Sequence, residues 1–266
     1  MAGGLVCGEI GVNAPYLPDM SLKGKLRRRV TRLADRKPLP TFTRRYVSFS
    51  FDDFPKSSAE HGAAALESHD LRGTYYACTG QLDTENHFGK LCSAKDIQRL
   101  ANAGHEIGCH TENHIDCAIS HPAIAESDAS RNRQVLGELG VHEVNSFAFP
   151  YGDVSFASKK ILAAFYATLR GVQPGINHRF ADANQLLAVP LEGDLPDADY
   201  ALSFLRALAS KPGWLIFYTH DVRKDCSDWG CTPTLLKHVI EAAVQMGATI
   251  APVSDVFKQI SQEATS

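Results

Sequence analysis

The sequence predicts an α/β protein whose parallel strands form a barrel, complete or incomplete. Three observations predict this class. Short apolar, β-like runs alternate with helix-like stretches from Arg45 to the C-terminal region, and such alternation implies parallel strands joined by helical crossovers. The chain holds roughly seven or eight of these units, close to the number that closes a barrel. Acidic and histidine side chains follow several of the runs, at the strand ends where parallel barrels place their active sites.

The predicted strands are apolar runs that turn or polar residues bound on both sides. They cover residues 46–51, 73–78, 105–109, 146–149, 166–169, 186–191, 214–219 and 249–252. The predicted helices lie between them, where alanine and larger apolar residues recur at helical spacing. They cover residues 59–69, 94–103, 122–139, 155–165, 198–210, 232–246 and 253–262. Ser93 and Asp96 form a capping box before the second helix, and Gly140 ends the third.

Composition limits the class of protein. The chain has 266 residues, 44% hydrophobic and 21% charged, which fits one large globular domain or at most two. A formal net charge of −3 gives no indication of a nucleic-acid partner. No segment approaches the roughly 20 apolar residues of a transmembrane helix, and residues 1–12 lack the basic start of a secretory signal. We therefore expect a cytoplasmic protein without a membrane span.

Residues 1–40 are expected to form an extension before the main domain at 41–266. Four prolines interrupt this stretch, and residues 23–37 are rich in lysine and arginine. One interpretation is a docking helix for an acidic partner or a membrane surface. The other is a solvated helix packed on the domain. We favour the second, because the apolar positions are too few for strong membrane binding.

Two adjacent acids, Asp52 and Asp53, end the first predicted strand, and His110 and His114 follow the third. Consecutive residues of a strand point in different directions, so one acid can bind a metal while the other stays free as a base. Two histidines four residues apart can reach one ion together. Asp53, His110 and His114 suit Zn²⁺ and tolerate Co²⁺, Ni²⁺ or Mn²⁺. They leave open coordination positions, which a hydrolytic metal needs for water and substrate.

Three further strand-end groups complete a candidate active site. Asp52 is the candidate general base, because a carboxylate beside a cation stays ionised and can take a proton from water. His220 follows the strand at 214–219, where it can protonate a leaving amine or alkoxide. Pro150 and Gly152 form a sharp turn around Tyr151, where a backbone N–H can face an oxyanion. The alternatives are a loop-capping acid, a structural histidine and an ordinary turn, and the shared strand-end position favours catalysis.

Together these residues resemble the polysaccharide deacetylase (NodB-homology) family, carbohydrate esterase family four. Residues 50–53 read Ser-Phe-Asp-Asp against the family's Thr-Phe-Asp-Asp, and residues 110–114 read His-Thr-Glu-Asn-His against His-Ser/Thr-x-x-His. The match runs from Arg45 to Phe257. The resemblance implies a distorted, incomplete (β/α)7 barrel related to the TIM barrel.

The resemblance also assigns roles. It implies that Asp52 is the base, that His220 is the acid, and that the backbone N–H of Tyr151 helps to stabilise the oxyanion. It implies that Asp53, His110 and His114 hold a divalent metal, for which the ligand chemistry favours zinc over cobalt, nickel or manganese.

Two departures from the family pattern affect the base and the acid. Ala148 stands where the third motif has an arginine that orients the base. Arg170, at the end of the next strand, is a candidate replacement, and weaker catalysis is the alternative. The fourth motif, whose aspartate tunes the acid histidine, is not recognisable, and Glu192 and Asp194 are candidate substitutes.

The leading functional hypothesis is a metal-dependent hydrolase that removes N-acetyl or O-acetyl groups from a carbohydrate or polysaccharide precursor. It would act on carbon–nitrogen bonds other than peptide bonds. One alternative is an amidohydrolase of the same fold that opens cyclic imides or ureides. Another is a degenerate member that binds glycans without cleaving them. The three metal ligands alone also fit a non-haem iron oxygenase, but Asp52 and His220 argue against it.

Overall fold

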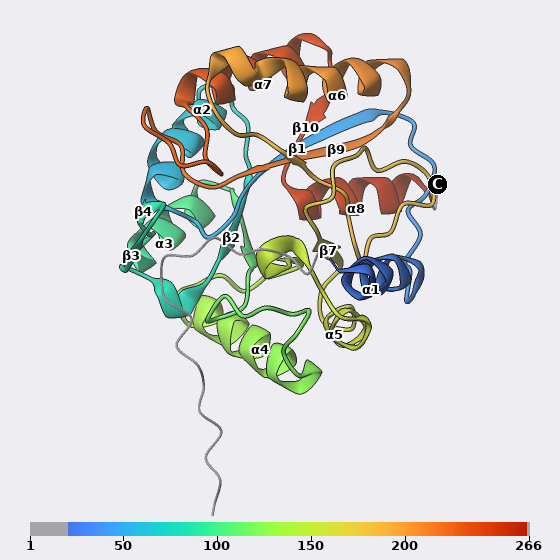
Figure 1. Cartoon of the computed structure of the whole chain (residues 1–266). Coiled ribbons are helices and arrows are strands. Elements are labelled where there is room, and N and C mark those ends of the chain that lie inside the picture. Colours follow the sequence, from blue (N-terminus) through green and yellow to red (C-terminus); the bar gives the residue numbers. More distant parts are fainter. Residues whose placement is uncertain (1–20, 265–266) are drawn as a thin grey trace, which may run out of the picture.

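A curved parallel sheet forms the centre of the molecule, and helices surround it (Figure 1). The computed structural model describes residues 21–264. The strands of the main sheet are β1 (Arg45–Phe51), β2 (Thr74–Ala77), β5 (Glu106–Cys109), β6 (Ser146–Ala148), β7 (Thr168–Arg170), β8 (Val189–Pro190), β9 (Gly213–Thr219) and β10 (Thr249–Ile250), and a separate hairpin consists of β3 (Glu85–Asn86) and β4 (Gly89–Lys90). The α-helices are α1 (Leu22–Leu33), α2 (Ala63–Glu67), α3 (Ala94–Asn102), α4 (Pro122–Glu138), α5 (Phe156–Leu162), α6 (Ala198–Ser210), α7 (Pro233–Gln245) and α8 (Val253–Glu263).

The strand order is β7-β6-β5-β2-β1-β9-β8, with β10 also paired to β1. All pairs in this sheet are parallel. Beyond β7 the segment 183–186 continues the hydrogen bonding, since Leu169 N–H donates to Ala183 O and Gly171 N–H to Leu186 O, at 2.8 and 3.0 Å. The sheet thus curls into a half-barrel, which confirms the predicted α/β class and the incomplete barrel.

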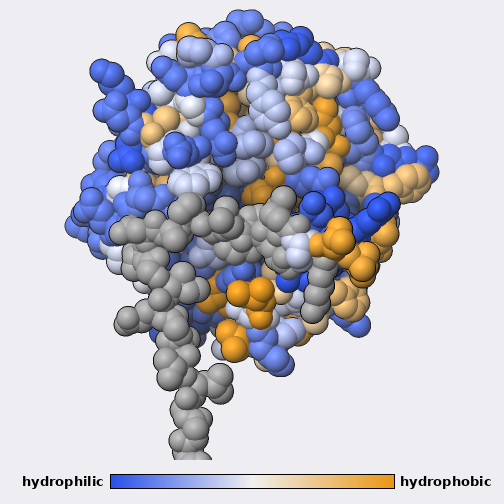
Figure 2. Space-filling model, viewed as in Figure 1, coloured by the Kyte–Doolittle hydropathy of each residue, from blue (hydrophilic) through white to orange (hydrophobic). Residues whose placement is uncertain are grey.

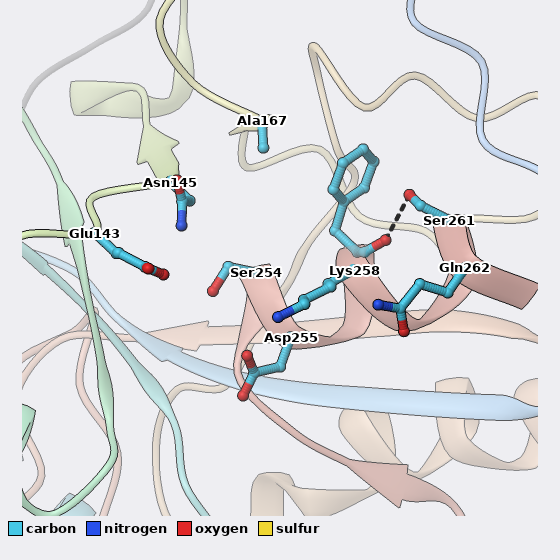
Figure 3. A pocket seen from close by; sticks show the side chains of 9 residues that line it. Glu143, Asn145, Ala167, Ser254, Asp255, Lys258, Ser261 and Gln262 are labelled. Carbon is cyan, nitrogen blue, oxygen red and sulfur yellow. Dashed lines mark hydrogen bonds between the residues drawn. The ribbon is translucent and has the colours of Figure 1, made fainter.

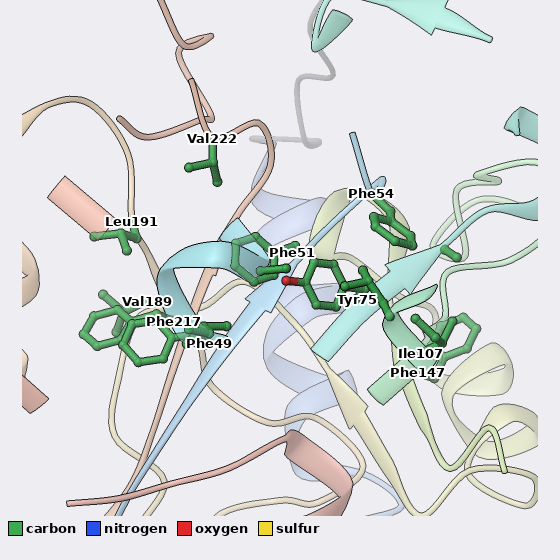
Figure 4. Packing of buried hydrophobic residues seen from close by; sticks show 14 of the residues in the cluster. Phe49, Phe51, Phe54, Tyr75, Ile107, Phe147, Val189, Leu191, Phe217 and Val222 are labelled. Atoms are coloured by element: carbon green, nitrogen blue, oxygen red, sulfur yellow. The ribbon is translucent and has the colours of Figure 1, made fainter. Parts of the chain in front are cut away.

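Both faces of the sheet are buried, and this fixes which way each strand residue points. Val47, Phe49 and Phe51 of β1 belong to a large apolar cluster between the sheet and its covering helices (Figure 4). There the ring of Phe51 stacks on Tyr75 at 4.6 Å. Tyr46 belongs to a second cluster on the other face, which includes α8 side chains. A shift of the β1 register by one residue would move its side chains to the opposite faces of the sheet. The register that carries Asp52 and Asp53 to the end of β1 is therefore strongly specified.

Every predicted strand and helix has a counterpart in the structure, with small differences at the ends. Ser93 and Asp96 form the predicted capping box of α3. The predicted strand at 186–191 is shorter, because only Val189–Pro190 pair as a strand. The predicted helix at 59–69 begins as a π-helical turn, Ser58–Gly62. The β3–β4 hairpin was not predicted, since strands of two residues show no usable alternation.

Helix α1 packs on the barrel through polar groups. Its buried residues include Gly24 and Thr31. Arg27 Nη2 donates to Asp153 Oδ2 at 2.9 Å, and the buried Lys159 Nζ of α5 donates to the carbonyl oxygen of Thr31 at 3.0 Å. The helix therefore lies on the domain, as favoured from the sequence. A solvated helix would be expected to turn its polar side to solvent, but α1 exposes its apolar side.

The stretch after α1 joins the packing of the barrel. Leu39 and Phe42 are buried in the second apolar cluster, and Leu39 N–H donates to Ala181 O at 2.8 Å. The division into an extension and a main domain at residue 40 stays a prediction, and residues 1–20 lie outside the described residues. Within residues 21–264, no helix has both the length and the apolar character needed to cross a bilayer.

His105, just before β5, holds three elements together and makes stability depend on pH. Its Nδ1 accepts the N–H of Gly73 at 3.0 Å, so Nε2 carries the proton and donates to Glu67 Oε1 at 3.1 Å. Burial lowers the pKa of His105, and Glu67 offsets this only in part. Below the unfolded-state pKa of about 6.5, the unfolded chain binds the proton more readily than the folded one, so stability falls as pH falls.

We expect His105→Gln to lower the unfolding free energy by roughly 2 kcal/mol at pH 7, because it removes or weakens two buried hydrogen bonds. Between pH 7.5 and 5 the stability of the variant should also decline less than that of the wild type. Urea unfolding at several pH values measures both. An unchanged pH slope would show that His105 is not the responsible group.

Candidate active site

The carboxyl ends of β1 and β5 bring three ligand-type side chains together. Asp53 follows β1, and His110 and His114 lie in the loop after β5. Oδ1 of Asp53 is 3.4 Å from Nε2 of His110 and 3.0 Å from Nε2 of His114. One ligand atom of each residue lies within 4.8 Å of the other two. One ion could contact all three at zinc distances of about 2.0–2.2 Å with small side-chain adjustments.

The hydrogen bonding of His110 turns a coordinating nitrogen toward Asp53. Its Nδ1 lies 2.8 Å from the carbonyl oxygen of Ala148, and because a carbonyl only accepts, Nδ1 carries the proton. This leaves Nε2 of His110 facing Oδ1 of Asp53, a buried oxygen without a hydrogen-bond partner among the described residues. A divalent ion between these two atoms would give both of them a partner. The donor set thus fits a divalent metal, with Ala148 fixing the ring from outside.

The neighbouring histidines keep the Asp53 carboxylate charged. Burial alone would raise the pKa of Asp53, but His114 and His110 beside it outweigh this effect, and the pKa lies well below its ordinary value. Burial alone would lower the pKa of His114, yet Asp53 raises it above the ordinary value. The carboxylate is therefore ionised across the physiological range, as a metal ligand must be.

The backbone around the cluster repeatedly adopts left-handed conformations without glycine. The φ angles are 54° at Asp53, 62° at Thr111, 53° at His114 and 59° at Tyr151. Such conformations each cost of order 1 kcal/mol or more and concentrate at functional sites. They give the sharp turns that direct these side chains and the Tyr151 backbone toward one place.

Helix α4 holds the histidine loop in position. Oδ1 of Asp128 accepts the backbone N–H groups of Glu112 and Asn113 at 2.7 and 3.0 Å. Within the loop, Oγ1 of Thr111 accepts the N–H of Ile115 at 3.1 Å. These bonds restrict the loop, so His110 and His114 are preorganised for a shared ligand.

Asp52 is buried beside this cluster, and Arg170 balances its charge. Nη2 of Arg170 donates to Oδ1 of Asp52. The guanidinium carbon lies 5.0 and 5.3 Å from the ring centroids of Tyr76 and Tyr218. Burial alone would lower the pKa of Arg170, but the Asp52 carboxylate outweighs this and raises it. The Asp52 carboxylate is thus held by one buried, permanently charged partner.

The sheet register explains how Arg170 reaches Asp52. Ala148 of β6 and Arg170 of β7 are direct partners in the parallel ladder. The guanidinium that Ala148 lacks can therefore come from Arg170, which lies one strand further along at the same level of the barrel. Arg170 contacts Asp52 as expected of a replacement for the third-motif arginine.

His220 leaves the sheet next to Asp52. The N–H of Asp52 donates to Thr219 O at 2.9 Å, which extends the β1–β9 ladder to the site. Nδ1 of His220 lies 3.1 Å from the carbonyl oxygen of Trp229, so Nδ1 carries a proton and Nε2 remains for proton exchange. The ring of Phe88 stacks on His220 at 4.6 Å. The half-buried imidazole is therefore fixed in orientation from two sides.

The two candidate substitutes for the fourth motif differ in position. Glu192 is half-buried, and burial raises its pKa while the nearby His220 partly offsets the rise. Asp194 instead caps a short 3-10 helix, where it accepts the N–H of Leu195 at 2.7 Å and the hydroxyl of Thr232 at 2.6 Å. Glu192 is thus the acid that can influence His220 electrostatically.

An aromatic rim at the site was missed from the sequence. The turn of the β3–β4 hairpin carries His87 and Phe88. The ring centroid of Trp229 lies 5.3 Å from that of His87 and 6.2 Å from that of Phe88. Tyr151, 41% exposed, packs its ring edge-on against His114 at 4.5 Å. The sequence signal was only an aromatic pair inside a polar loop, a pattern too common to single out.

A pocket of about 420 Å³ lies at the other end of the strands (Figure 3). Its lining comes from α8 and from the segments that enter β6 and β7: Glu143, Asn145, Ala167, Ser254, Asp255, Phe257, Lys258, Ser261 and Gln262. Active sites of parallel barrels lie at the carboxyl ends of the strands. This pocket therefore does not belong to the candidate site.

Solved structures share the fold. One is the Xyl-CE4 domain of a multidomain xylanase from the hindgut metagenome of Trinervitermes trinervoides, 18% identical, with 82% of this chain and 91% of that chain covered and a TM-score of 0.57. A family 4 acetyl xylan esterase from Clostridium thermocellum, in complex with a cobalt ion, is 18% identical over 81% and 91%, with a TM-score of 0.59. A CE4 family pseudoenzyme from Bacillus anthracis is 12% identical over 84% and 70%, with a TM-score of 0.53. These likenesses define the class of fold, a NodB-like half-barrel.

The sequence also matches a family model. Residues 40–169 match the polysaccharide deacetylase family model. The matched range contains Asp52, Asp53, His110, His114 and Tyr151, whereas His220 lies beyond it. This match confirms the resemblance to that family seen in the motifs of the chain. No curated protein sequence matches it significantly.

Proposed function

We propose that this protein is a metal-dependent hydrolase that removes N-acetyl or O-acetyl groups from a carbohydrate or polysaccharide precursor. The observation that carries the proposal is the convergence of one ligand atom each from Asp53, His110 and His114, beside a separate buried carboxylate, Asp52. The structure of the Clostridium thermocellum esterase contains cobalt, which supports a divalent ion. We expect zinc, with cobalt, nickel or manganese as substitutes.

A divalent ion held by these three residues would lower the pKa of a water molecule and polarise the substrate carbonyl. Asp52 would accept the proton that the attacking water loses. Arg170 binds Oδ1 of Asp52, so Oδ2 is the oxygen that would take this proton. A base held in one orientation by a buried guanidinium is suited to that role.

His220 would supply the proton that the leaving amine or alkoxide needs. Its Nδ1–H bond to Trp229 O directs Nε2 away from that carbonyl, and Nε2 would carry the transferred proton. The backbone N–H of Tyr151, placed by a left-handed turn after β6, would donate to the developing oxyanion. Base, acid and oxyanion donor thus come from three different strand ends.

The aromatic rim supports a sugar as substrate. Phe88, Trp229 and Tyr151 surround the acid and the metal ligands. The carbon-rich face of a sugar ring packs well on aromatic side chains, and small-molecule sites combine such rings with a few polar groups. Two of the structures with this fold are named for xylan-directed enzymes, which agrees with a carbohydrate substrate.

The test is acetate release from acetylated chito-oligosaccharides and acetylated xylan, with zinc or cobalt added to pure protein. We expect Asp52→Asn to lower kcat by roughly 10²–10⁴-fold, the range of general base catalysis, because an amide cannot accept the proton. Asp70→Asn is the matched control, since the Asp70 carboxylate is 96% exposed and Asp70 precedes β2, at the opposite end of the strands from the site.

Two outcomes would contradict the proposal. Equal activity of the wild type and Asp52→Asn would remove Asp52 from the mechanism. A wild type that binds metal and acetylated glycan but releases no acetate would place the chain with non-catalytic members of this fold, such as the Bacillus anthracis pseudoenzyme. A panel that includes cyclic imides and ureides checks whether the substrate class differs.

A further inference from the structure

Helix α1 presents an apolar stripe to solvent. Leu22, Leu26, Val30 and Leu33 are 86%, 63%, 52% and 70% exposed. Their spacing of four, four and three residues places all four on one side of the helix. An ordinary surface helix turns such a stripe toward the core, so the exposure of all four is unexpected for a helix that is packed on the domain.

The opposite side of α1 is the one that contacts the barrel, and it is polar. Gly24, Arg27 and Thr31 recur at spacings of three and four residues, so they share the inner face. Gly24 and Thr31 are buried, Arg27 pairs with Asp153, and Lys159 donates to Thr31 O. The amphipathic helix is thus anchored by ion pairs and hydrogen bonds, with its apolar side outward.

Basic residues flank the apolar stripe. Residues 21–37 contain eight of the 27 lysines and arginines of the chain and only one acid, Asp35, whereas the whole chain has a net charge of −3. Lys25, Arg29 and Arg32 are exposed. Figure 2 shows hydrophobic side chains beside strongly hydrophilic ones over α1, on the right of the view. An apolar stripe bordered by cations is complementary to an anionic bilayer surface, with acyl chains beneath charged headgroups.

We propose that α1 is a docking helix that lies on an anionic membrane surface, inserts its leucine stripe and places its basic residues at the headgroups. A second copy of the chain fits less well. A two-fold dimer through this face would set α1 against α1, and the basic residues of the two copies would repel. The stripe is also convex and one helix wide, without the concave groove in which a partner helix lies.

Docking through α1 would hold the candidate active site near the membrane. Asp153, the partner of Arg27, is two residues beyond Tyr151 in the turn after β6. A direct ion pair therefore joins the helix to the turn that carries Tyr151. A substrate presented at the membrane surface would then approach the rim without leaving the headgroup region.

The experiment uses the full chain and sedimentation with vesicles. One set contains phosphatidylcholine alone, and the other contains phosphatidylcholine with one part in three of phosphatidylglycerol. We expect binding to the anionic vesicles that is at least tenfold stronger than to the neutral ones and that weakens in high salt. Replacing Lys25 and Arg29 by glutamine should weaken it about fivefold per residue. Vesicle binding is measured without substrate or metal, so this test is independent of the proposed hydrolase activity.

The leucine stripe is tested with Leu26→Ser/Leu33→Ser. Both side chains are exposed, so the fold should be retained, and vesicle binding should fall by roughly tenfold or more. Ile119→Ser/Ile124→Ser is the matched control and should bind like the wild type. Ile119 lies just before α4 and Ile124 within it, and they are 72% and 56% exposed. Absence of binding to anionic vesicles, including the case in which residues 1–20 cover the stripe, would overturn the proposal. Unchanged binding by the leucine variant, or a dimer that this variant disrupts, would also overturn it.

Discussion

Asp53→Asn is expected to abolish metal binding and with it acetate release. The substitution keeps the size of the side chain but removes the negative charge of the cluster. Loss of an outer partner of a metal ligand typically costs 10–100-fold in affinity, and we expect loss of the charged ligand itself to cost about 100-fold or more. A divalent ion at a hundred times its dissociation constant should stabilise the wild type by about 2.7 kcal/mol, and the variant should lose this stabilisation.

The readout is thermal unfolding with and without zinc, which does not depend on turnover. Asp52→Asn is the matched control, because it removes the neighbouring charge but leaves all three ligands in place. It should keep the zinc-dependent increase in unfolding temperature while losing activity. If Asp53→Asn keeps the zinc effect, or if Asp52→Asn loses it, the assignment of ligand and base to these two aspartates is wrong.

Arg170→Met is expected to have the second-largest effect, since it leaves Asp52 as an unpaired buried charge. Removing one partner of a buried ion pair typically costs about 3–5 kcal/mol. An unpaired buried carboxylate also binds a proton more readily, so the acid limb of the kcat profile should move to higher pH. Denaturant unfolding and a pH profile of kcat measure the two effects separately. An unchanged pH profile would show that Arg170 is purely structural.

A rescue experiment tests whether the two strand positions are interchangeable. Ala148 and Arg170 are register partners, so the double variant Ala148→Arg/Arg170→Ala moves the guanidinium to the position of the third-motif arginine. We expect this variant to be more stable and more active than Arg170→Ala alone. A double variant no better than the single one would mean that the guanidinium must come from β7.

The sequence was sufficient to predict most of the fold, because long apolar periodicities decide strand and helix. The clustering of Asp53, His110 and His114 was also predictable, since these residues follow strands whose carboxyl ends must converge in a parallel barrel. The side chains that contact the site residues were harder to predict from the sequence. Whether Arg170 reaches Asp52 depends on the register of β6 against β7, and this is a tertiary property.

Three features could not be read from the chain in advance. The β3–β4 hairpin that carries Phe88 to His220 is too short to give a periodic signal. The choice between Glu192 and Asp194 depends on where a 3-10 helix begins, since Asp194 is used as its cap. The orientation of α1 is set by the pairing of Arg27 with Asp153, a contact between residues far apart in the sequence. Each of these depends on contacts that form only in the folded chain.

The central claim is that one divalent ion binds Asp53, His110 and His114. The most direct test is anomalous diffraction at the zinc edge from crystals of the wild type grown with zinc. The account predicts a peak at about 2.0–2.2 Å from Asp53 Oδ1 and from Nε2 of both histidines. A fully loaded crystal with no peak between these atoms, or with the ion held by other side chains, would contradict it.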